Sequence, residues 1–452
     1  MSQKSTNTDQ YNKMVNTPVL KLISALSVPT IISMLITNIY NLADTAFVGQ
    51  LGTSASGAVG IVFGFMAILQ AIGFLFGQGG GSILSRKLGA RDVEGAGRIG
   101  STSFFSALFA SSIVAIICYI NLDSVVSLLG STSTIAPFAK TYITYILISA
   151  PFLVTSFTMN NILRYEGKAA LGTIGMMTGA LLNIIGDPIF MFALNMGIAG
   201  AGLSTALSQI VSFSILLSMF LRKKTDTRLS IYLVTKDYKD VLNILATGVP
   251  SLLRQCLGSL ATVVLNQMAA PYGDSAIAAM SIVSRISFFV FSIALGIAQG
   301  FQPVSAFNYG AGKFKRVKSA YKVTIILGES LMLILSVIAF AMSGDLIKIF
   351  RDDPSVIEIG TRALRLQLMA QVISPPCMIT EMLCQSTGKR FAAAVLSSLR
   401  SGFIFIPLLI IMSKLRGLYG IEEAQPLAIV ISAIPAIIYA FSFFKELPSE
   451  DT

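Results

Sequence analysis

The sequence predicts an all-α polytopic membrane protein with twelve transmembrane helices in two pseudo-symmetric six-helix bundles. Composition, the spacing of apolar runs and an internal repeat predict this fold class. Of the 452 residues, 54% are hydrophobic and only 12% are charged, and the mean hydropathy is +0.75. A water-exposed surface cannot have this composition. Apolar runs of about 20 residues recur along the chain, and each is long enough to cross a hydrocarbon core of about 30 Å.

The repeat relates the two halves of the chain. A shift of 221 residues carries Pro29 onto Pro250, Gly52 onto Gly273, and Gly167-Lys168 onto Gly388-Lys389. Because these matches share one offset and fall at the same places between apolar runs, chance is a poor explanation. Each half holds an even number of spans, so the two bundles are parallel and related by an axis along the membrane normal, as in transporters that work by alternating access.

The apolar runs place the twelve spans in order along the chain. The first bundle has spans near 20–46, 54–77, 98–120, 137–163, 169–194 and 199–221. The second bundle has spans near 241–269, 275–300, 319–342, 360–383, 391–414 and 425–444. We therefore expect an N-terminal tail at 1–16, a first lobe at 17–221, a linker at 222–240, a second lobe at 241–445 and a C-terminal tail at 446–452.

Basic residues set the orientation of the spans. Lysine and arginine cluster after every second span, for example Arg86, Lys87 and Arg91, and again along 222–239, whereas the opposite loops are short and carry few or mixed charges. This positive-inside pattern predicts that both termini are cytoplasmic. The absence of histidine and tryptophan favours a low-GC bacterial source, so we expect the bacterial inner (cytoplasmic) membrane. The polar N-terminus lacks a signal-peptide pattern, and the first apolar run should be retained.

The same features exclude other classes of protein. The net charge of +11 lies in short loops between spans and does not form a basic face, so nucleic acid is not an expected partner. Cys118, Cys256, Cys377 and Cys384 lie in or beside apolar runs, which favours buried thiols over a disulfide framework. No G-x-x-x-x-G-K-[ST] motif occurs, and GQGGGS at 77–82 is better explained by helix packing or a hinge. We expect no enzyme activity and no cofactor, and we expect a monomer.

The segment 183–205 carries the polar groups that are most unusual for a membrane span. Asp187 lies in an apolar run, with Asn183 on the same helical face and Thr205 in the next span. Pro188 has no N–H, so the carbonyl of Ile184 loses its helical partner. A carboxylate at membrane depth costs about 2.5–3.5 kcal/mol on insertion scales and is a functional hypothesis by default. The alternative is that Asp187-Pro188 only caps a helix end near the interface.

Counting residues from the outer turns places a second carboxylate, that of Asp44, at the same membrane depth as Asp187. Asp44 in the first span, Asp187 and Thr205 each lie five to eight residues from an outer turn, on the order of 8–12 Å below the outer face at ~1.5 Å per residue. Tyr40 shares a helical face with Asp44. Two buried carboxylates cannot both stay charged and unpaired, so a proton or a cation must join them. Carboxylate, amide and hydroxyl oxygens are hard ligands that suit Na⁺ or H⁺.

These residues resemble the multidrug and toxic compound extrusion (MATE) family, in its DinF/MepA-like branch, over roughly residues 17–445. The resemblance rests on NLADTAFVGQLG in the first span, Asn-x-x-x-Asp-Pro in the fifth and Thr205 in the sixth. It implies a V-shaped pair of bundles and a cation or proton site formed by Asp44, Asn183, Asp187 and Thr205, with Tyr40 beside them, and Na⁺ as the candidate metal. It also implies a hinge at Pro29. Other members carry a carboxylate in the seventh span, where this chain has Arg254, Gln255 and Gly258.

Two further sets of residues have two interpretations each. A substrate cavity can be lined by polar and methionine side chains of the first lobe, namely Met34, Asn38, Gln70, Met159, Asn160, Asn161 and Met176. Ordinary interhelical packing explains each of them equally well. In the second lobe, Glu381 can form a second coupling site, although ion pairing with Arg254, Arg285 or Arg400 explains it better.

Together these inferences predict a secondary antiporter. Na⁺ or H⁺ would move inward, and amphipathic, often cationic organic compounds would move outward, so the expected partners are small organic molecules, the coupling ion and the bilayer. The alternative is a flippase for lipid-linked saccharide precursors, which would need a strongly cationic cavity. A non-transporting scaffold or receptor leaves the repeat and the carboxylates unexplained.

Overall fold

The computed structural model describes residues 3–448, and within that range the chain is helical, with no β-strand. The first half contains α1 Gln3–Asn16, α2 Val19–Gly49, α3 Thr53–Gly89, α4 Val93–Ile120, α5 Leu122–Leu128, α6 Ala136–Tyr165, α7 Ala169–Pro188, the π turn η1 Ile189–Ala193 and α8 Gly197–Leu221. The short 3₁₀ turn η2 Ile231–Leu233 follows in the linker.

The second half repeats this pattern. It contains α9 Tyr238–Ala269, η3 Ala270–Tyr272, α10 Asp274–Gly310, α11 Phe314–Ala341, α12 Ser343–Phe350, α13 Pro354–Gln371, α14 Ser374–Thr387, α15 Arg390–Ser398, the π turn η4 Leu399–Phe403, α16 Phe405–Arg416 and α17 Leu418–Glu446. Repeat-related turns have the same backbone: Gly52 and Gly273 have φ of 107° and 89°, and Gly167 and Gly388 have φ of 79° and 85°. Glycine adopts these left-handed values without steric cost.

Eleven helical segments of the described chain are long and apolar enough to cross a membrane, against the twelve predicted spans. The exception is the tenth predicted span, 360–383, which is divided between α13 and α14. Pro375 and Pro376 cannot donate to the carbonyls one turn earlier, and the hydroxyl of Ser374 donates to the carbonyl of Gln371 at 2.8 Å. Charged residues of α13, such as Glu358 and Arg362, also lower its hydropathy.

The chain folds as two compact units whose boundaries differ from the predicted lobes. Unit 1 holds Ile32–Leu252 with the part of α1 up to Lys13, and unit 2 holds Met14–Ile31 with the chain from Leu253 onward. All three internal boundaries fall inside helices: one inside α1, and the other two inside α2 and α9, two residues after Pro29 and Pro250. The predicted N-terminal tail at 1–16 contains helix α1.

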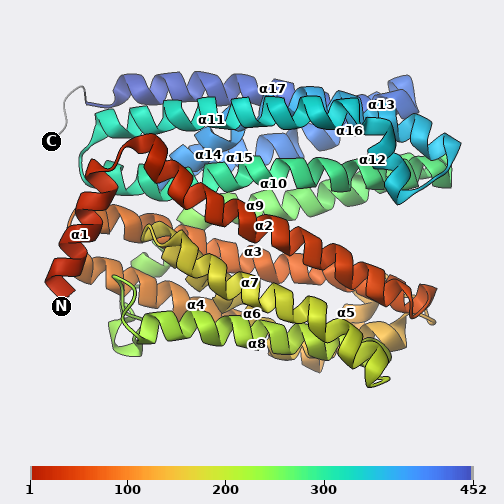
Figure 1. The fold of residues 1–452 in the computed structure, drawn as a ribbon, viewed down its shortest axis with the longest axis horizontal. Coiled ribbons are helices and arrows are strands. Elements are labelled where there is room, and N and C mark those ends of the chain that lie inside the picture. Colours follow the sequence, from red (N-terminus) through yellow and green to blue (C-terminus); the bar gives the residue numbers. More distant parts are fainter. Residues whose placement is uncertain (1–2, 449–452) are drawn as a thin grey trace. The chain divides into compact units, whose positions relative to one another are not determined.

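Glycines of α3 explain why unit 1 is closely packed. A Cβ on Gly73 would lie 2.7 Å from the Cβ of Phe157, and one on Gly77 would lie 2.9 Å from the Cβ of Asn161. A Cβ on Gly81 would overlap the ring of Tyr165. These three glycines are one helical turn apart and face α6, which packs against α3; Figure 1 shows both helices among those of unit 1. The glycine-rich segment 77–82 therefore serves helix packing, one of the two roles that the sequence left open.

Candidate ion-binding site

Polar side chains from four helices of unit 1 meet in its interior. They are Asp44 and Tyr40 from α2, Tyr142 from α6, Asn183 and Asp187 from α7, and Ser204 and Thr205 from α8. Asp187 and Tyr142 are completely buried, and Asp44, Asn183 and Thr205 are each 2% exposed. The depth count made from the sequence had placed Asp44, Asp187 and Thr205 at one level, and the structure brings these groups together.

Asn183 is the centre of the hydrogen bonding. Its amide nitrogen is 3.2 Å from Oδ1 of Asp187, 3.3 Å from Oγ of Ser204 and 3.2 Å from Oγ1 of Thr205. The hydroxyl of Ser204 in turn lies 3.3 Å from the main-chain carbonyl of Asn183. One side chain thus connects α7 to α8 and holds Asp187 one helical turn away.

The carboxyl groups of Asp44 and Asp187 lie against each other, within hydrogen-bonding reach. The phenol groups of Tyr40 and Tyr142 lie close enough to interact electrostatically with both carboxylates. Two carboxylates can share a hydrogen bond only if one of them holds a proton, and two charged ones need a cation between them. The geometry therefore suits a site that always contains either a proton or a cation.

Three oxygens at this site have no hydrogen-bond donor among the described residues: Oδ1 of Asp44, Oδ2 of Asp187 and Oδ1 of Asn183. Buried polar atoms are nearly always satisfied, so a cluster of three requires an explanation. Two carboxylate oxygens and one amide oxygen form a hard donor set with the chemistry that Na⁺ prefers, and the carboxylates can bind H⁺ instead.

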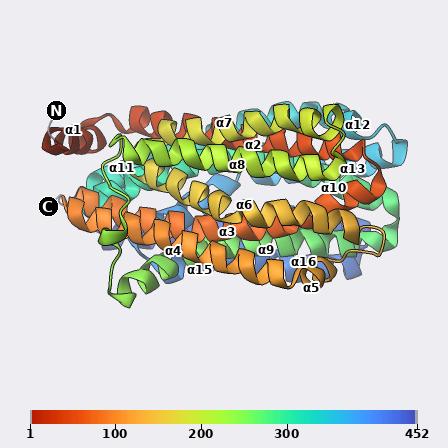
Figure 2. The same cartoon turned by 90° about the horizontal axis from the view of Figure 1, so that it is seen from below.

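Local backbone structure sets the position of Asp187. Pro188 ends α7, and the chain continues as the π turn η1, a form of helix that often occurs at functional sites. Glycine allows α8 to approach: a Cβ on Gly200 would lie 2.6 Å from the carbonyl carbon of Phe190, and a Cβ on Gly186 would lie 2.5 Å from Oγ of Ser204. Figure 2 shows α7 and α8 side by side along their length.

A small cavity of about 20 Å³ adjoins the site. It is lined by Thr37, Tyr40, Phe157, Met176, Gly179, Ala180, Asn183, Gln209 and Ser212. This volume is enough for about one water molecule, and its polar lining can supply the partners that a buried water needs. The cavity touches both Tyr40 and Asn183 and so extends the polar region beyond the carboxylates.

The residues predicted to line a substrate cavity have different surroundings in the structure. Met176 lines the small cavity just described. Met159 and Asn161 are completely buried, and Asn161 donates to the carbonyl of Phe157 at 2.7 Å and accepts from Arg164 at 2.5 Å. Asn160 lies against Gly172 of α7. The remaining three, Met34, Asn38 and Gln70, are partly exposed.

Sequence reasoning missed two residues of the site, Tyr142 and Ser204. Tyr142 lies five residues after Pro137, near the predicted outer end of the fourth span, so a depth count places it at the level of the site but does not show that its side chain faces Asp44. Ser204 directly precedes Thr205, and both face Asn183. A serine hydroxyl in a membrane helix commonly bonds to its own backbone, so the position of Ser204 was not a specific signal.

Charged residues inside unit 2 form an ion pair. Arg254 of α9 donates to Glu381 of α14, and the two side chains are 11% and 3% exposed. Arg400, in the π turn η4, lies over the ring of Phe291 at 4.5 Å. Of the two interpretations of Glu381, this geometry favours ion pairing.

The sequence model of the MatE family matches residues 29–189 and again 250–411. The chain belongs to the MATE family. The two matched segments begin at Pro29 and Pro250, so the family model detects the same repeat as the 221-residue shift. The predicted family and fold class are both confirmed.

Relatives of this MATE chain are similar over nearly its whole length. Multidrug export protein MepA of Staphylococcus saprophyticus is 30% identical over 424 residues, which cover 94% of each chain. A solved outward-facing multidrug resistance MATE transporter is 26% identical with a TM-score of 0.92, covering 96% of this chain and 98% of its own. A MATE structure in the bent conformation is also 26% identical, with a TM-score of 0.90 and coverage of 97% and 98%.

Proposed function

We propose that this chain is a secondary multidrug exporter that couples inward movement of Na⁺ or H⁺ to outward movement of amphipathic, often cationic organic compounds. The observation that carries the proposal is the buried pair Asp44 and Asp187, with unpartnered acceptor oxygens beside it. The multidrug export names of its relatives support the substrate class. Both termini would lie on the cytoplasmic side of a bacterial inner membrane, and the chain would work as a monomer without chemical change of its substrates.

The residues of the site would act in sequence during transport. Asp44 and Asp187 bind the coupling ion, and Asn183 orients Asp187 and ties it to Ser204 and Thr205. The ion neutralises the repulsion between the carboxylates, which allows α2 and α7 to approach. We propose that α2 then bends at Pro29, and the relative solved in a bent conformation supports such a change. Each inward unit charge supplies about 2.3 kcal/mol per 100 mV of membrane potential.

The coupling ion and the role of the carboxylates can be tested together in proteoliposomes. Efflux of a fluorescent organic cation is measured with a Na⁺ gradient alone, a pH gradient alone, and both. We expect one of the two gradients to drive efflux in the wild type and neither to drive it in the D44N/D187N double variant. A T178A variant is the matched control, because Thr178 lies on α7 but bonds only locally, to the carbonyl of Ile174. Full transport by the double variant would exclude the proposed site.

The flippase alternative has less support. It needs cationic side chains that can hold a pyrophosphate, and the guanidinium of Arg254 already pairs with Glu381. An assay with a labelled lipid carrier distinguishes the two functions. Translocation of the carrier without gradient-driven drug efflux would favour the flippase, and a protein that moves neither would favour a scaffold or receptor.

A further inference from the structure

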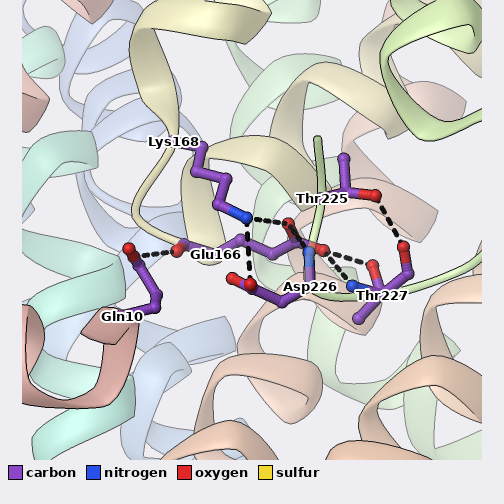
Figure 3. A network of polar contacts seen from close by, with 6 residues as sticks. All are labelled: Gln10, Glu166, Lys168, Thr225, Asp226 and Thr227. Carbon is purple, nitrogen blue, oxygen red and sulfur yellow. Dashed lines mark hydrogen bonds and ion pairs between the residues drawn. The ribbon is translucent and has the colours of Figure 1, made fainter. Parts of the chain in front are cut away.

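Within unit 1, which includes the linker 222–240, the linker is attached to the other helices through Glu166, in the loop between α6 and α7. One carboxylate oxygen of Glu166 accepts from the main-chain N–H of Thr227 at 3.0 Å and from the Thr227 hydroxyl, and the other accepts from the N–H of Asp226 at 3.0 Å. Figure 3 shows these bonds and the neighbouring contact in which Gln10 of α1 donates to the main-chain carbonyl of Glu166 at 2.6 Å.

The charges in this cluster do not balance. Glu166 and Asp226 are 1% and 4% exposed, and the ammonium group of Lys168 lies 3.0 Å from Oδ1 of Asp226 and 3.9 Å from Oε2 of Glu166. Apart from this ion pair, neither carboxylate oxygen of Asp226 has a hydrogen-bond partner in the described part of the chain. Two buried carboxylates and one ammonium give a net charge of −1, and one bound proton makes the cluster neutral.

The other contacts described for the cluster are made by uncharged groups. The charges that act on Glu166 come from Asp226 and Lys168, α1 contributes the amide of Gln10, and the linker contributes the hydroxyls of Thr225 and Thr227. From α4, the hydroxyl of Ser101 binds the carbonyl of Arg228 at 2.8 Å. Hence nothing in these contacts replaces the missing positive charge.

We infer that Glu166 and Asp226 form a second proton-binding site, at the end of unit 1 predicted to be cytoplasmic, which fastens the linker to unit 1 while it holds a proton. The site is separate from Asp44 and Asp187 and does not depend on which ion drives transport. Its ligand is a proton from the aqueous phase. Loss of that proton leaves two buried carboxylates competing for Lys168, so the contact through Asp226 and Thr227 is weakened.

Thermodynamic linkage between proton binding at Glu166 and docking of the linker gives the direction in which pH changes the docking equilibrium. Burial, with a further contribution from the charge of Asp226, raises the pKa of Glu166 to about 7 in the docked linker, although Lys168 opposes the shift. Once the linker is released, Glu166 is solvated and its pKa returns toward the ordinary value of about 4.3. The docked state therefore binds the proton more tightly. Docking is favoured at low pH, and its equilibrium constant falls about tenfold between pH 6 and pH 8.

The linker has further contacts that do not titrate. The N–H of Ser230 donates to Ser101 at 3.1 Å, and the N–H of Thr235 donates to Thr102 at 3.0 Å. We therefore expect release to be confined to the segment around Asp226 and Thr227. The segment around Asp226 and Thr227 leads toward α9, and Lys168 is the N-cap of α7. A change of pH on the side predicted to be cytoplasmic can therefore affect the start of both helices.

Hydrogen–deuterium exchange of the full-length protein tests the inference directly. Protection of the Asp226 and Thr227 amides is measured at pH 6, 7 and 8, after correction for intrinsic exchange with an unstructured peptide of the same sequence. In the wild type, protection should fall about tenfold from pH 6 to pH 8, as linkage requires, while the Ser230 and Thr235 amides stay constant.

Variants identify the proton site. D226N removes one of the two carboxylates and leaves both acceptor oxygens of Glu166 in place, so it should keep these amides protected at every pH. E166Q should also abolish the pH dependence, although its side chain keeps only one of the two oxygens that accept from the linker amides. The matched control is E94Q, because Glu94 is an exposed acid at the same end of unit 1 and should behave like the wild type. Constant protection in the wild type from pH 6 to pH 8, or a wild-type pH dependence in both E166Q and D226N, would overturn the inference.

Discussion

Gly248 of α9 and Leu75 of α3 meet backbone against backbone, and a Cβ added to Gly248 would overlap the carbonyl group of Leu75. The repeat-related helices α10 and α2 approach in the same way in unit 2: a Cβ on Gly300 of α10 would lie 2.7 Å from the main-chain nitrogen of Ser27 on α2. These contacts explain why the start of α9 belongs to unit 1 and why Met14–Ile31 belongs to unit 2.

We expect G248A to destabilise the protein, because the added methyl group meets main-chain atoms that cannot rotate away. Overpacking of this kind costs about 1–3 kcal/mol. Cys377 and Cys384 are buried, whereas Cys256 is exposed and Cys118 is partly exposed, against the expectation that all four thiols are buried. A thiol-reactive dye can therefore follow thermal unfolding in detergent through Cys377 and Cys384 in a C118S/C256S background. G258A is the control on the same helix, since its Cβ would meet nothing within 4 Å, and alanine should leave the melting temperature equal or higher. An equal decrease of the melting temperature in G248A and G258A would contradict the close backbone contact at Gly248.

Asn183 is expected to set the affinity for the coupling ion. N183A removes the amide that holds Asp187, Ser204 and Thr205 together, and loss of such an orienting partner typically weakens metal affinity about 10–100-fold. The dependence of drug efflux on Na⁺ concentration or on pH, measured in proteoliposomes, gives the apparent affinity. T178A should not change it. If N183A transports with the wild-type affinity, Asn183 is only a packing residue.

The polar residues of the ion site could be predicted because membrane depth is a one-dimensional quantity. Counting residues from Gly52 and from Asn195 is enough to bring Asp44 and Asp187 to one level, since helical rise is constant. What the count cannot give is rotation about the helix axis. For that reason Tyr142 was missed, and Met159 and Asn161, which face the packed interior, were grouped with Met176 as possible cavity residues.

The unit boundaries could not be predicted for a different reason. Hydropathy and charge divide the chain at the polar linker 222–240, but they contain no information on which helix a glycine faces. Gly79 and Gly248 could have been recognised as small residues only, and their mutual approach depends on both helices. The cluster at Glu166 was equally hidden, because Glu166-Gly167-Lys168 has the composition of an ordinary loop.

Asp92 is expected to stabilise the start of α4 as its N-cap. Its carboxylate accepts from the N–H of Gly95 at 2.8 Å and pairs with Lys87 at 2.8 Å, and the hydrogen bond to Lys87, followed by that to Gly95, lowers the pKa of Asp92. A lowered pKa means that the contribution is present above the ordinary value and is lost as the pH falls below it. D92A should cost about 1 kcal/mol.

The control for this prediction is D92N, because asparagine caps helices as well as aspartate does but cannot pair with Lys87. Amide exchange at residues 93–96 measures the fraying of the helix start. D92A should increase exchange at neutral pH, and D92N should stay near the wild type. Similar fraying in both variants would show that the ion pair with Lys87, and not the cap, is the stabilising contact.

Variants of the Arg254–Glu381 ion pair can show whether Glu381 has a structural role or a role in ion coupling. Breaking a buried pair by removing one partner costs about 3–5 kcal/mol, whereas replacing both with apolar residues is often neutral or stabilising. We therefore expect R254M and E381M each to lower the melting temperature, and the R254M/E381M double variant to recover it. Gradient-driven efflux gives the second readout. If the pair is structural, the recovered double variant transports like the wild type, since Asp44 and Asp187 are intact. If it folds but has lost coupling, Glu381 is part of the ion pathway.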